Sequence, residues 1–208
     1  MRTAVHCKIR DAATIVRPVP AEEDILTFFF TDIEDSTRRW ESHGEVMAGA
    51  LARHDAIVQG AVVEFGGRIF KHTGDGMCIA FEGVDCAAKA VRGATEIQRR
   101  LLAEPWGELG DLKVRMGLHA GPAERRGDDF FGPVLNRVAR FMSAASGGQI
   151  VVSGAVRERA APELDDIEFS DLGWHRFKGL TSPEHMFHVE GPGLAPFAQA
   201  EDPEADMD

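Results

Sequence analysis

The feature that most constrains the fold is a short apolar run, ILTFFF at residues 25–30, which passes directly into the polar stretch TDIEDST at residues 31–37. A run this short, rich in Phe and Ile and closed by polar residues, predicts a buried strand. Asp35 or Ser36 suits the N-cap of a following helix. Asp32 then lies at a strand end beside free helix N–H groups, where phosphate oxygens and a hard cation are both favoured. The stretch indicates a site for a metal-bound phosphate ester, with a purely structural acidic cap as the alternative.

A second stretch strengthens the first interpretation. Residues 66–81 predict two short strands joined by a tight Thr-Gly-Asp-Gly turn at residues 73–76. Asp75 lies at the tip between two glycines, where the backbone can approach another group closely. Two carboxylates at the ends of adjacent strands can hold two divalent ions for an in-line displacement at phosphorus. Together, Asp32 and Asp75 predict a metal site, although a lone Asp-Gly turn is usually only a turn.

The spacing of apolar residues predicts the order of the elements. Residues 40–65 and 84–102 have helical spacing, with a break near Gly44 in the first segment. Residues 112–119 alternate as a strand with one buried face. With the strands described above, the order is strand, helix, strand, strand, helix, strand. This order predicts an α+β fold with a ferredoxin-like, split βαβ core, in which helices back one face of an antiparallel sheet.

The second half of the chain continues with shorter elements. Residues 121–129 are polar and rich in Gly and Arg, which predicts an excursion from the core. Pro133 suits the first turn of a helix that runs to about residue 145. Further elements are expected in this order: a strand at 149–153, a short helix at 156–160, and strands around 167–177 and 185–189.

One domain is expected, because 208 residues suffice for one well-packed core and are few for two. We expect a partly ordered N-terminal arm at residues 1–23, the domain at residues 24–190, and an acidic, disordered tail with several prolines at residues 191–208.

Composition narrows the class of function. The net charge of −11 argues against a nucleic-acid surface, which needs a basic stripe. No stretch approaches membrane-spanning length, and no secretory signal is recognisable. The three cysteines, Cys7, Cys78 and Cys86, lack metal-ligand spacing, so a reducing, cytoplasmic setting is expected and the last two are interpreted as buried hydrophobes. His43 and His54 are interpreted as structural residues.

Separated motifs carry a resemblance to a known family. FTDIEDST at residues 30–37, KHTGD at residues 71–75 and DFFGPVLNRVAR at residues 129–140 resemble the catalytic domain of the class III nucleotide cyclases, especially the bacterial single-domain type. The likeness runs from about residue 24 to residue 190, with the motifs in the family's order. It implies the same core and adenylyl cyclase chemistry, in which the ribose 3′ oxygen of ATP attacks the α-phosphorus and pyrophosphate leaves.

The resemblance also implies roles for individual residues. Asp32 and Asp75 match the two metal-binding aspartates, and the carbonyl of Ile33 completes a site for two divalent cations, Mg²⁺ or Mn²⁺. Asn136 and Arg140 are four residues apart on the expected helix and share one face. The match assigns Asn136 to the ribose and Arg140 to the α-phosphate, with an ordinary exposed helix face as the alternative.

Lys178, in the sequence Phe-Lys-Gly, matches a lysine that binds the terminal phosphates. Base choice is implied for Lys71 and Asp129, since Lys71 can donate to the ring nitrogen of adenine and Asp129 can accept from its amino group. Guanine reverses both groups, so such a pair should reject it. Because Asp128 directly precedes Asp129, the sequence leaves open which of the two aspartates takes this role.

The family's half-sites face each other across a two-fold axis, which implies a head-to-tail homodimer with two composite sites. One departure is Asp35, which stands where relatives often have glycine; its charge could slow turnover, or its side chain could cap the helix and point away. The alternatives to an adenylyl cyclase are a guanylyl cyclase and a catalytically weak cyclase-like module that acts as a regulatory partner. A dinucleotide cyclase or palm polymerase would share the core, but no GGDEF-like turn is present.

Overall fold

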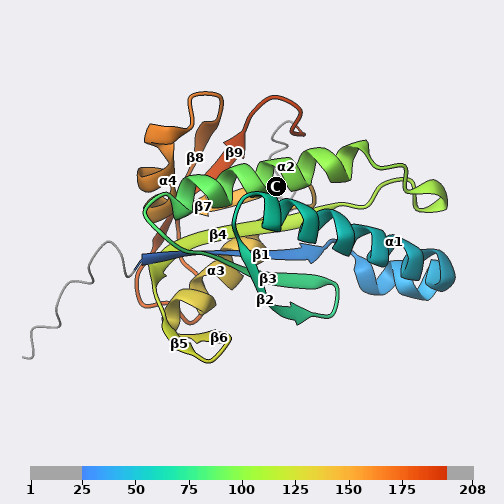
Figure 1. Cartoon of the computed structure of the whole chain (residues 1–208), viewed down its shortest axis with the longest axis horizontal. Coiled ribbons are helices and arrows are strands. Elements are labelled where there is room, and N and C mark those ends of the chain that lie inside the picture. Colours follow the sequence, from blue (N-terminus) through green and yellow to red (C-terminus); the bar gives the residue numbers. More distant parts are fainter. Residues whose placement is uncertain (1–24, 196–208) are drawn as a thin grey trace, which may run out of the picture.

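A computed structural model describes residues 25–195 as a seven-stranded sheet with helices on both faces. The expected N-terminal arm and most of the expected tail lie outside the described residues. Figure 1 shows the element order, which is β1 (Ile25–Ile33), α1 (Ser36–Glu64), β2 (Arg68–Thr73), β3 (Gly76–Phe81), α2 (Cys86–Ala103), η2 (Gly107–Leu109), β4 (Val114–Pro122), β5 (Glu124–Arg126), β6 (Asp129–Phe131), α3 (Pro133–Ala144), β7 (Ile150–Ser153), α4 (Gly154–Ala160), η3 (Ala161–Glu163), β8 (Glu168–His175) and β9 (Glu184–Glu190).

The sheet has the strand order β2-β3-β1-β4-β7-β9-β8. Strand β1 pairs antiparallel with both β3 and β4, which confirms the predicted split βαβ core. One neighbouring pair, β4 and β7, is parallel. A parallel pair requires a crossover connection, and α3 lies within that connection. The predicted excursion at residues 121–129 includes the end of β4 and most of a small separate sheet formed by β5 and β6.

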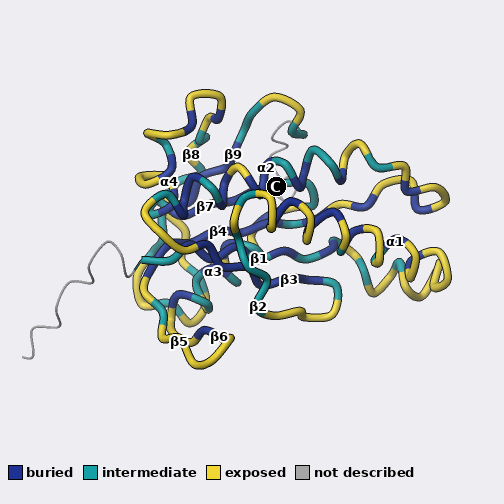
Figure 2. The backbone as a smooth tube through the Cα atoms, in the orientation of Figure 1, coloured by how far each residue is buried: buried dark blue, intermediate teal, exposed yellow. Residues whose placement is uncertain are grey.

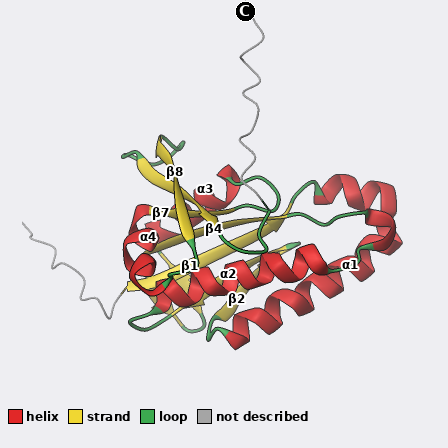
Figure 3. Cartoon of the chain, turned by 90° about the horizontal axis from the view of Figure 1, so that it is seen from above, coloured by secondary structure: helices red, strands yellow, loops and turns green. Residues whose placement is uncertain are grey.

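Helices α1, α2 and α4 cover one face of the sheet, and α3 covers part of the other (Figure 3). Successive side chains of a strand point to opposite faces, so Phe29 packs into the larger core and Phe28 into the smaller one, both fully buried. Burying one such side chain is worth about 1.5–3 kcal/mol. At Gly117 on β4, a Cβ atom would collide with the backbone of Met142 on α3. Glycine there allows the close approach of α3.

Helix α1 is bent near the predicted break. His43, next to Gly44, has φ −142° and ψ 41°, so the helix is kinked there. Beyond the kink, the predicted apolar face is buried against the sheet and α2 (Figure 2). His54 on this face is fully buried, as expected for a core histidine, while His43 is exposed. Burial lowers the pKa of His54, although its contact with Asp55 opposes that shift.

The cysteines within the described residues agree with their interpretation as buried hydrophobes. Cys78 and Cys86 are buried free thiols. Burial raises the pKa of Cys78 to about 11, so this thiol stays protonated and unreactive at neutral pH. Among residues 25–195, no helix combines the length and the apolar character needed to cross a lipid bilayer.

A β-bulge in β2 changes which face its last residues occupy. Ile69 pairs with Ile79, but Lys71 pairs with Cys78, so Phe70 is the extra residue between them. Without the bulge, Phe70 would pair with Cys78, and Lys71 would fall on the face covered by α1 and α2. Directly paired residues share a face, so the bulge turns Lys71 to the face that carries α3.

Candidate active site

The two aspartates predicted from the sequence line one open cavity of about 520 Å³. Asp32 is near the end of β1, and Asp75 lies in the turn between β2 and β3. These elements are joined directly, because the Thr31 hydroxyl oxygen accepts a hydrogen bond from the Met77 amide at 3.1 Å. The full lining comprises Asp32, Ile33, Asp35, Ser36, Thr37, Arg38, Glu41, Asp75 and Arg115.

Glycine is required where the turn meets β1. A Cβ atom on Gly76 would collide with the carbonyl oxygen of Thr31, so a larger residue would push the turn away from the strand. In the Gly-Asp-Gly sequence, Gly74 thus supplies the positive φ that the turn needs, and Gly76 allows close packing against β1. It keeps Asp75 beside the end of β1.

Asp75 has an unsatisfied buried oxygen. Its Oδ2 atom is buried and has no hydrogen-bond partner among the described residues. A buried carboxylate oxygen without a partner is costly, and a bound cation would remove that cost. No group of three or more His, Cys, Asp or Glu side chains in the described part of the chain could hold a metal. The residues fit a hard cation bound by the two aspartates and completed by backbone oxygens, of which the carbonyl of Ile33 is a candidate, and by substrate oxygens.

Arg115 is the residue that the sequence analysis missed. Asp32 on β1 is directly opposite Arg115 on β4, and their side chains form an ion pair in which Nη2 donates to Oδ2. The sequence does place an arginine, Arg115, within the strand predicted at residues 112–119. Its partner depends on the register of two strands that are more than 80 residues apart, so no local pattern identifies it.

Asp35 adopts a backbone conformation that favours glycine. It has φ 56° and ψ 25°, the left-handed region, and it is the one non-glycine residue with positive φ within residues 25–195. Asp tolerates this region better than most residues do. Asp35 is at the predicted N-cap position of α1, but its side chain makes no capping hydrogen bond. The first N–H groups of α1 therefore have no side-chain cap from Asp35, and the first residues of the helix, Ser36, Thr37 and Arg38, line the cavity.

Lys71 and Asp129 lie together within one chain. Lys71 Nζ is 3.8 Å from Asp129 Oδ2, and the other oxygen of Asp129 accepts a hydrogen bond from the Phe130 amide at 2.8 Å. Asp128 instead uses its backbone carbonyl to accept from Arg68 at 3.0 Å. Of the two neighbouring aspartates, Asp129 is therefore the one that pairs with Lys71.

Three further predicted residues, Asn136, Arg140 and Lys178, do not line the cavity of Asp32 and Asp75. Asn136 and Arg140 are both exposed on α3, one turn apart, as their spacing predicted. Lys178 is exposed in the turn that follows β8. None of these three side chains forms a hydrogen bond or ion pair with any residue in the range 25–195. The predicted residues thus fall into three sets: Asp32, Ile33 and Asp75 at the cavity, Lys71 in contact with Asp129, and three exposed side chains.

Comparisons with known proteins identify the family to which the chain belongs. The sequence model of one protein family, the adenylate and guanylate cyclase catalytic domain, matches residues 19–191 of this chain. An uncharacterized protein of Mycobacterium tuberculosis is 33% identical over 172 residues, which cover 81% of this chain and 57% of that protein. The chain therefore spans less than two thirds of the length of this curated relative.

Solved structures share the fold. Adenylate cyclases from Trypanosoma brucei, analysed in their monomeric state, match with a TM-score of 0.77 at 26% identity, over 88% of this chain and 95% of that chain. A guanylate cyclase domain from Catenaria anguillulae in complex with GTP matches with a TM-score of 0.72 at 20% identity, over 81% of this chain and 97% of that chain.

Proposed function

The chain belongs to the family of adenylate and guanylate cyclase catalytic domains, and from this membership we propose that it is an adenylyl cyclase. The proposed reaction converts ATP to 3′,5′-cyclic AMP and pyrophosphate through attack of the ribose 3′ oxygen on the α-phosphorus. Two parts of the described structure support the proposal. They are the cavity with Asp32 and Asp75, and the Lys71–Asp129 pair.

Asp32 and Asp75 would hold two divalent cations, Mg²⁺ or Mn²⁺, in the cavity at the end of β1. When bound, such ions lower the pKa of the 3′ hydroxyl and neutralise charge on the triphosphate. The uncapped N–H groups at the start of α1 would donate to phosphate oxygens. With a cation held by Asp32, the guanidinium of Arg115, which now pairs with that carboxylate, would be available to the same phosphates.

The observation that carries the choice of adenine is the 3.8 Å contact between Lys71 and Asp129. The lysine would donate to the ring nitrogen of adenine, and the carboxylate would accept from its amino group. Guanine presents a ring N–H toward the lysine and a carbonyl oxygen toward the carboxylate, so both contacts would be repulsive. ATP is therefore the proposed substrate and GTP the rejected one.

A complete site would require two chains. Asn136, Arg140 and Lys178 are exposed and lie outside the cavity of Asp32 and Asp75 within one chain. In a head-to-tail homodimer, one chain would supply the two aspartates, and the other would supply Lys71, Asp129 and these three side chains. Arg140 would stabilise charge on the α-phosphate in the transition state, Asn136 would orient the ribose, and Lys178 would bind the terminal phosphates.

We place the reaction in the cytoplasm as part of the same proposal. The unpaired thiols of Cys78 and Cys86 are consistent with a reducing compartment.

The test is an assay of the purified protein with Mn²⁺ and either ATP or GTP, in which the product is identified by chromatography and mass spectrometry. Cyclic AMP from ATP, at a kcat/KM well above that for GTP, would support the proposal. A preference for GTP would instead indicate a guanylyl cyclase. No cyclic product from either nucleotide, by a protein that is folded and dimeric, would indicate a regulatory module.

A further inference from the structure

Arg68 on β2 connects the main sheet to the small β5–β6 hairpin. Its Nη1 donates to the carbonyl oxygen of Asp128 at 3.0 Å, and its Cζ lies 5.1 Å from the centroid of the Phe130 ring. Asp128 and Phe130 are the residues immediately before and after Asp129. Arg68 therefore contacts the chain on both sides of the carboxylate that pairs with Lys71.

The Phe130 ring that Arg68 covers is itself well packed. It is 2% exposed and makes edge-to-face contacts with Phe28 at 5.2 Å and with Phe70 at 5.1 Å between centroids. Such edge-to-face contacts stabilise the ring beyond the area that they bury. Phe70 is the extra residue of the β2 bulge, so the bulge supplies the ring that supports Phe130 and also turns Lys71 toward the hairpin.

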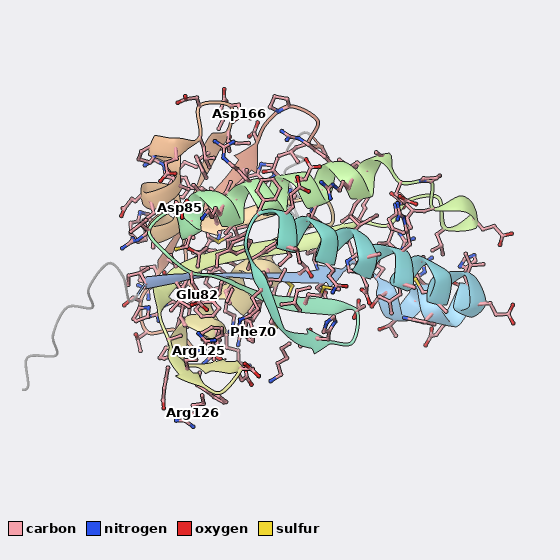
Figure 4. All side chains as sticks on the ribbon, viewed as in Figure 1. Phe70, Glu82, Asp85, Arg125, Arg126 and Asp166 are labelled. Atoms are coloured by element: carbon pink, nitrogen blue, oxygen red, sulfur yellow. The ribbon has the colours of Figure 1, made fainter. Side chains whose placement is uncertain are left out.

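Glu82 joins Arg68 to a second arginine. One of its oxygens lies 3.9 Å from Arg68 and 3.5 Å from Arg125, whose guanidinium is also 5.9 Å from the Phe130 ring. Figure 4 shows Glu82, Phe70 and Arg125 gathered where the hairpin meets the sheet, whereas Arg126 projects from the outer side of the hairpin. The contacts of Arg68 belong to a cluster at the base of the hairpin.

We propose that Arg68 is a positioning residue for base choice, because it fixes residues 128–130 so that Asp129 stays opposite Lys71. This inference rests on the proposed function. If the Asp129 carboxylate moved away from Lys71, it could no longer accept a hydrogen bond from adenine's amino group in a fixed direction. It also could not hold a negative charge at a fixed position against guanine's carbonyl oxygen. The property that depends on Arg68 is therefore the ratio of ATP use to GTP use.

A purely structural role makes a different prediction. If Arg68 only stabilised the fold, its loss would lower the amount of active enzyme and reduce turnover of both nucleotides by the same factor. A positioning role changes the ratio of the two kcat/KM values, which does not depend on the fraction of folded protein.

The experiment compares Arg68→Gln with Arg126→Gln. Arg126 lies on the same hairpin. Within the described residues its side chain pairs with Glu124 and covers the exposed ring of Phe131, and it makes no hydrogen bond with Asp128 and no cation–π contact with Phe130. Arg68→Gln removes one charge-assisted hydrogen bond, one cation–π contact and the ion pair with Glu82, and we expect it to lower the ATP-to-GTP ratio of kcat/KM about tenfold. Arg126→Gln should leave the ratio within about twofold.

Amide hydrogen exchange gives a readout that does not depend on catalysis. Residues 128–131 should exchange faster in Arg68→Gln than in the wild type or in Arg126→Gln. Arg68→Lys, which keeps the charge but not the planar guanidinium, should give an intermediate ratio and serves as the test if Arg68→Gln does not fold.

The outcomes separate the two proposals. An active wild type whose nucleotide ratio and hairpin exchange are unchanged in Arg68→Gln and Arg68→Lys would overturn the role of Arg68 alone. A folded wild type that cyclises neither nucleotide would overturn the proposed function, and with it the role of Arg68 in base choice.

Discussion

Asp32 and Arg115 face each other across β1 and β4, and their ion pair lies at the cavity that also contains Asp75. The two side chains are 25% and 31% exposed, so the pair is neither fully buried nor free in solvent. A guanidinium here gives Asp32 a partner while no cation is bound. If a cation binds Asp32 as proposed, the guanidinium would have to yield or share the carboxylate, and it would then offer positive charge to an anionic substrate.

Arg115→Gln should therefore strengthen Mn²⁺ binding in the absence of nucleotide. A partly exposed ion pair is worth up to about 1 kcal/mol, so removal of this competitor should lower the Kd by up to about fivefold in titration calorimetry. Arg38→Gln is the matched control, because Arg38 lines the same cavity but forms no ion pair with the described residues. An equal change in both variants, or none in Arg115→Gln, would contradict competition for Asp32.

Asp75→Asn should abolish cyclisation without harming the fold. The cation would lose a charged ligand, so we expect kcat to fall by at least about a hundredfold. Because Asp75 Oδ2 has no partner, the neutral amide should leave the free energy of unfolding in metal-free buffer unchanged or raise it by up to about 1 kcal/mol. Thermal unfolding with and without EDTA checks the second part, and Asp165→Asn on an exposed turn is the control. Near-normal activity in folded Asp75→Asn, or in Asp32→Asn, would argue against the metal site.

The Lys71–Asp129 pair predicts a change of nucleotide preference. Lys71→Glu combined with Asp129→Ala should weaken ATP use and permit some GTP use, since the new carboxylate can accept from guanine's ring N–H and the loss of Asp129 removes repulsion of its carbonyl oxygen. The measurement is kcat/KM for each nucleotide. A double variant that keeps full preference for ATP would show that these residues do not read the base.

Complementation tests whether the site is shared between chains. Homodimers of Asp32→Ala and of Arg140→Ala should each be nearly inactive, but a mixed dimer puts both lesions in one site and leaves the other intact. With random pairing after co-expression, activity should recover to about a quarter of the wild-type value per chain if the sites are independent. Mixed dimers, verified by differently tagged chains, that remain as inactive as their parents would rule out a shared site.

His119 predicts a loss of stability in mild acid. It is buried beside Phe141, with parallel rings at 5.7 Å, and burial, aided by the nearby charge of Arg137, lowers its pKa to about 4. The unfolded chain, with a histidine pKa near 6.5, binds the proton more readily. The stabilising contribution of neutral His119 is therefore complete above about pH 6.5 and is lost as the pH falls toward 4, by up to about 3 kcal/mol.

The measurement is urea denaturation of wild type and His119→Gln at pH 7.5 and pH 5. The variant should lose less of its free energy of unfolding between these two values than the wild type does. His43→Gln, at an exposed position, should behave as the wild type does. Equal losses in wild type and His119→Gln would show that His119 does not contribute to acid sensitivity.

Local sequence patterns were enough to predict most elements. The polar end of the run at residues 25–30 located the start of α1 to within a residue, and Gly44 located its kink equally well. The pairing of Asp129 rather than Asp128 with Lys71 could not be settled in this way, because the two residues are adjacent, chemically identical and part of a short polar hairpin.

What the sequence by itself determined is the order of strands and helices and the presence of Asp32 and Asp75 at element ends, because apolar spacing, glycine turns and caps act over a few residues. Only the tertiary structure decided that Arg115 meets Asp32 and that the bulge at Phe70 turns Lys71 toward Asp129. Strand register and bulges are fixed by packing against partners far along the chain, and a shift of one residue moves a side chain to the opposite face of the sheet.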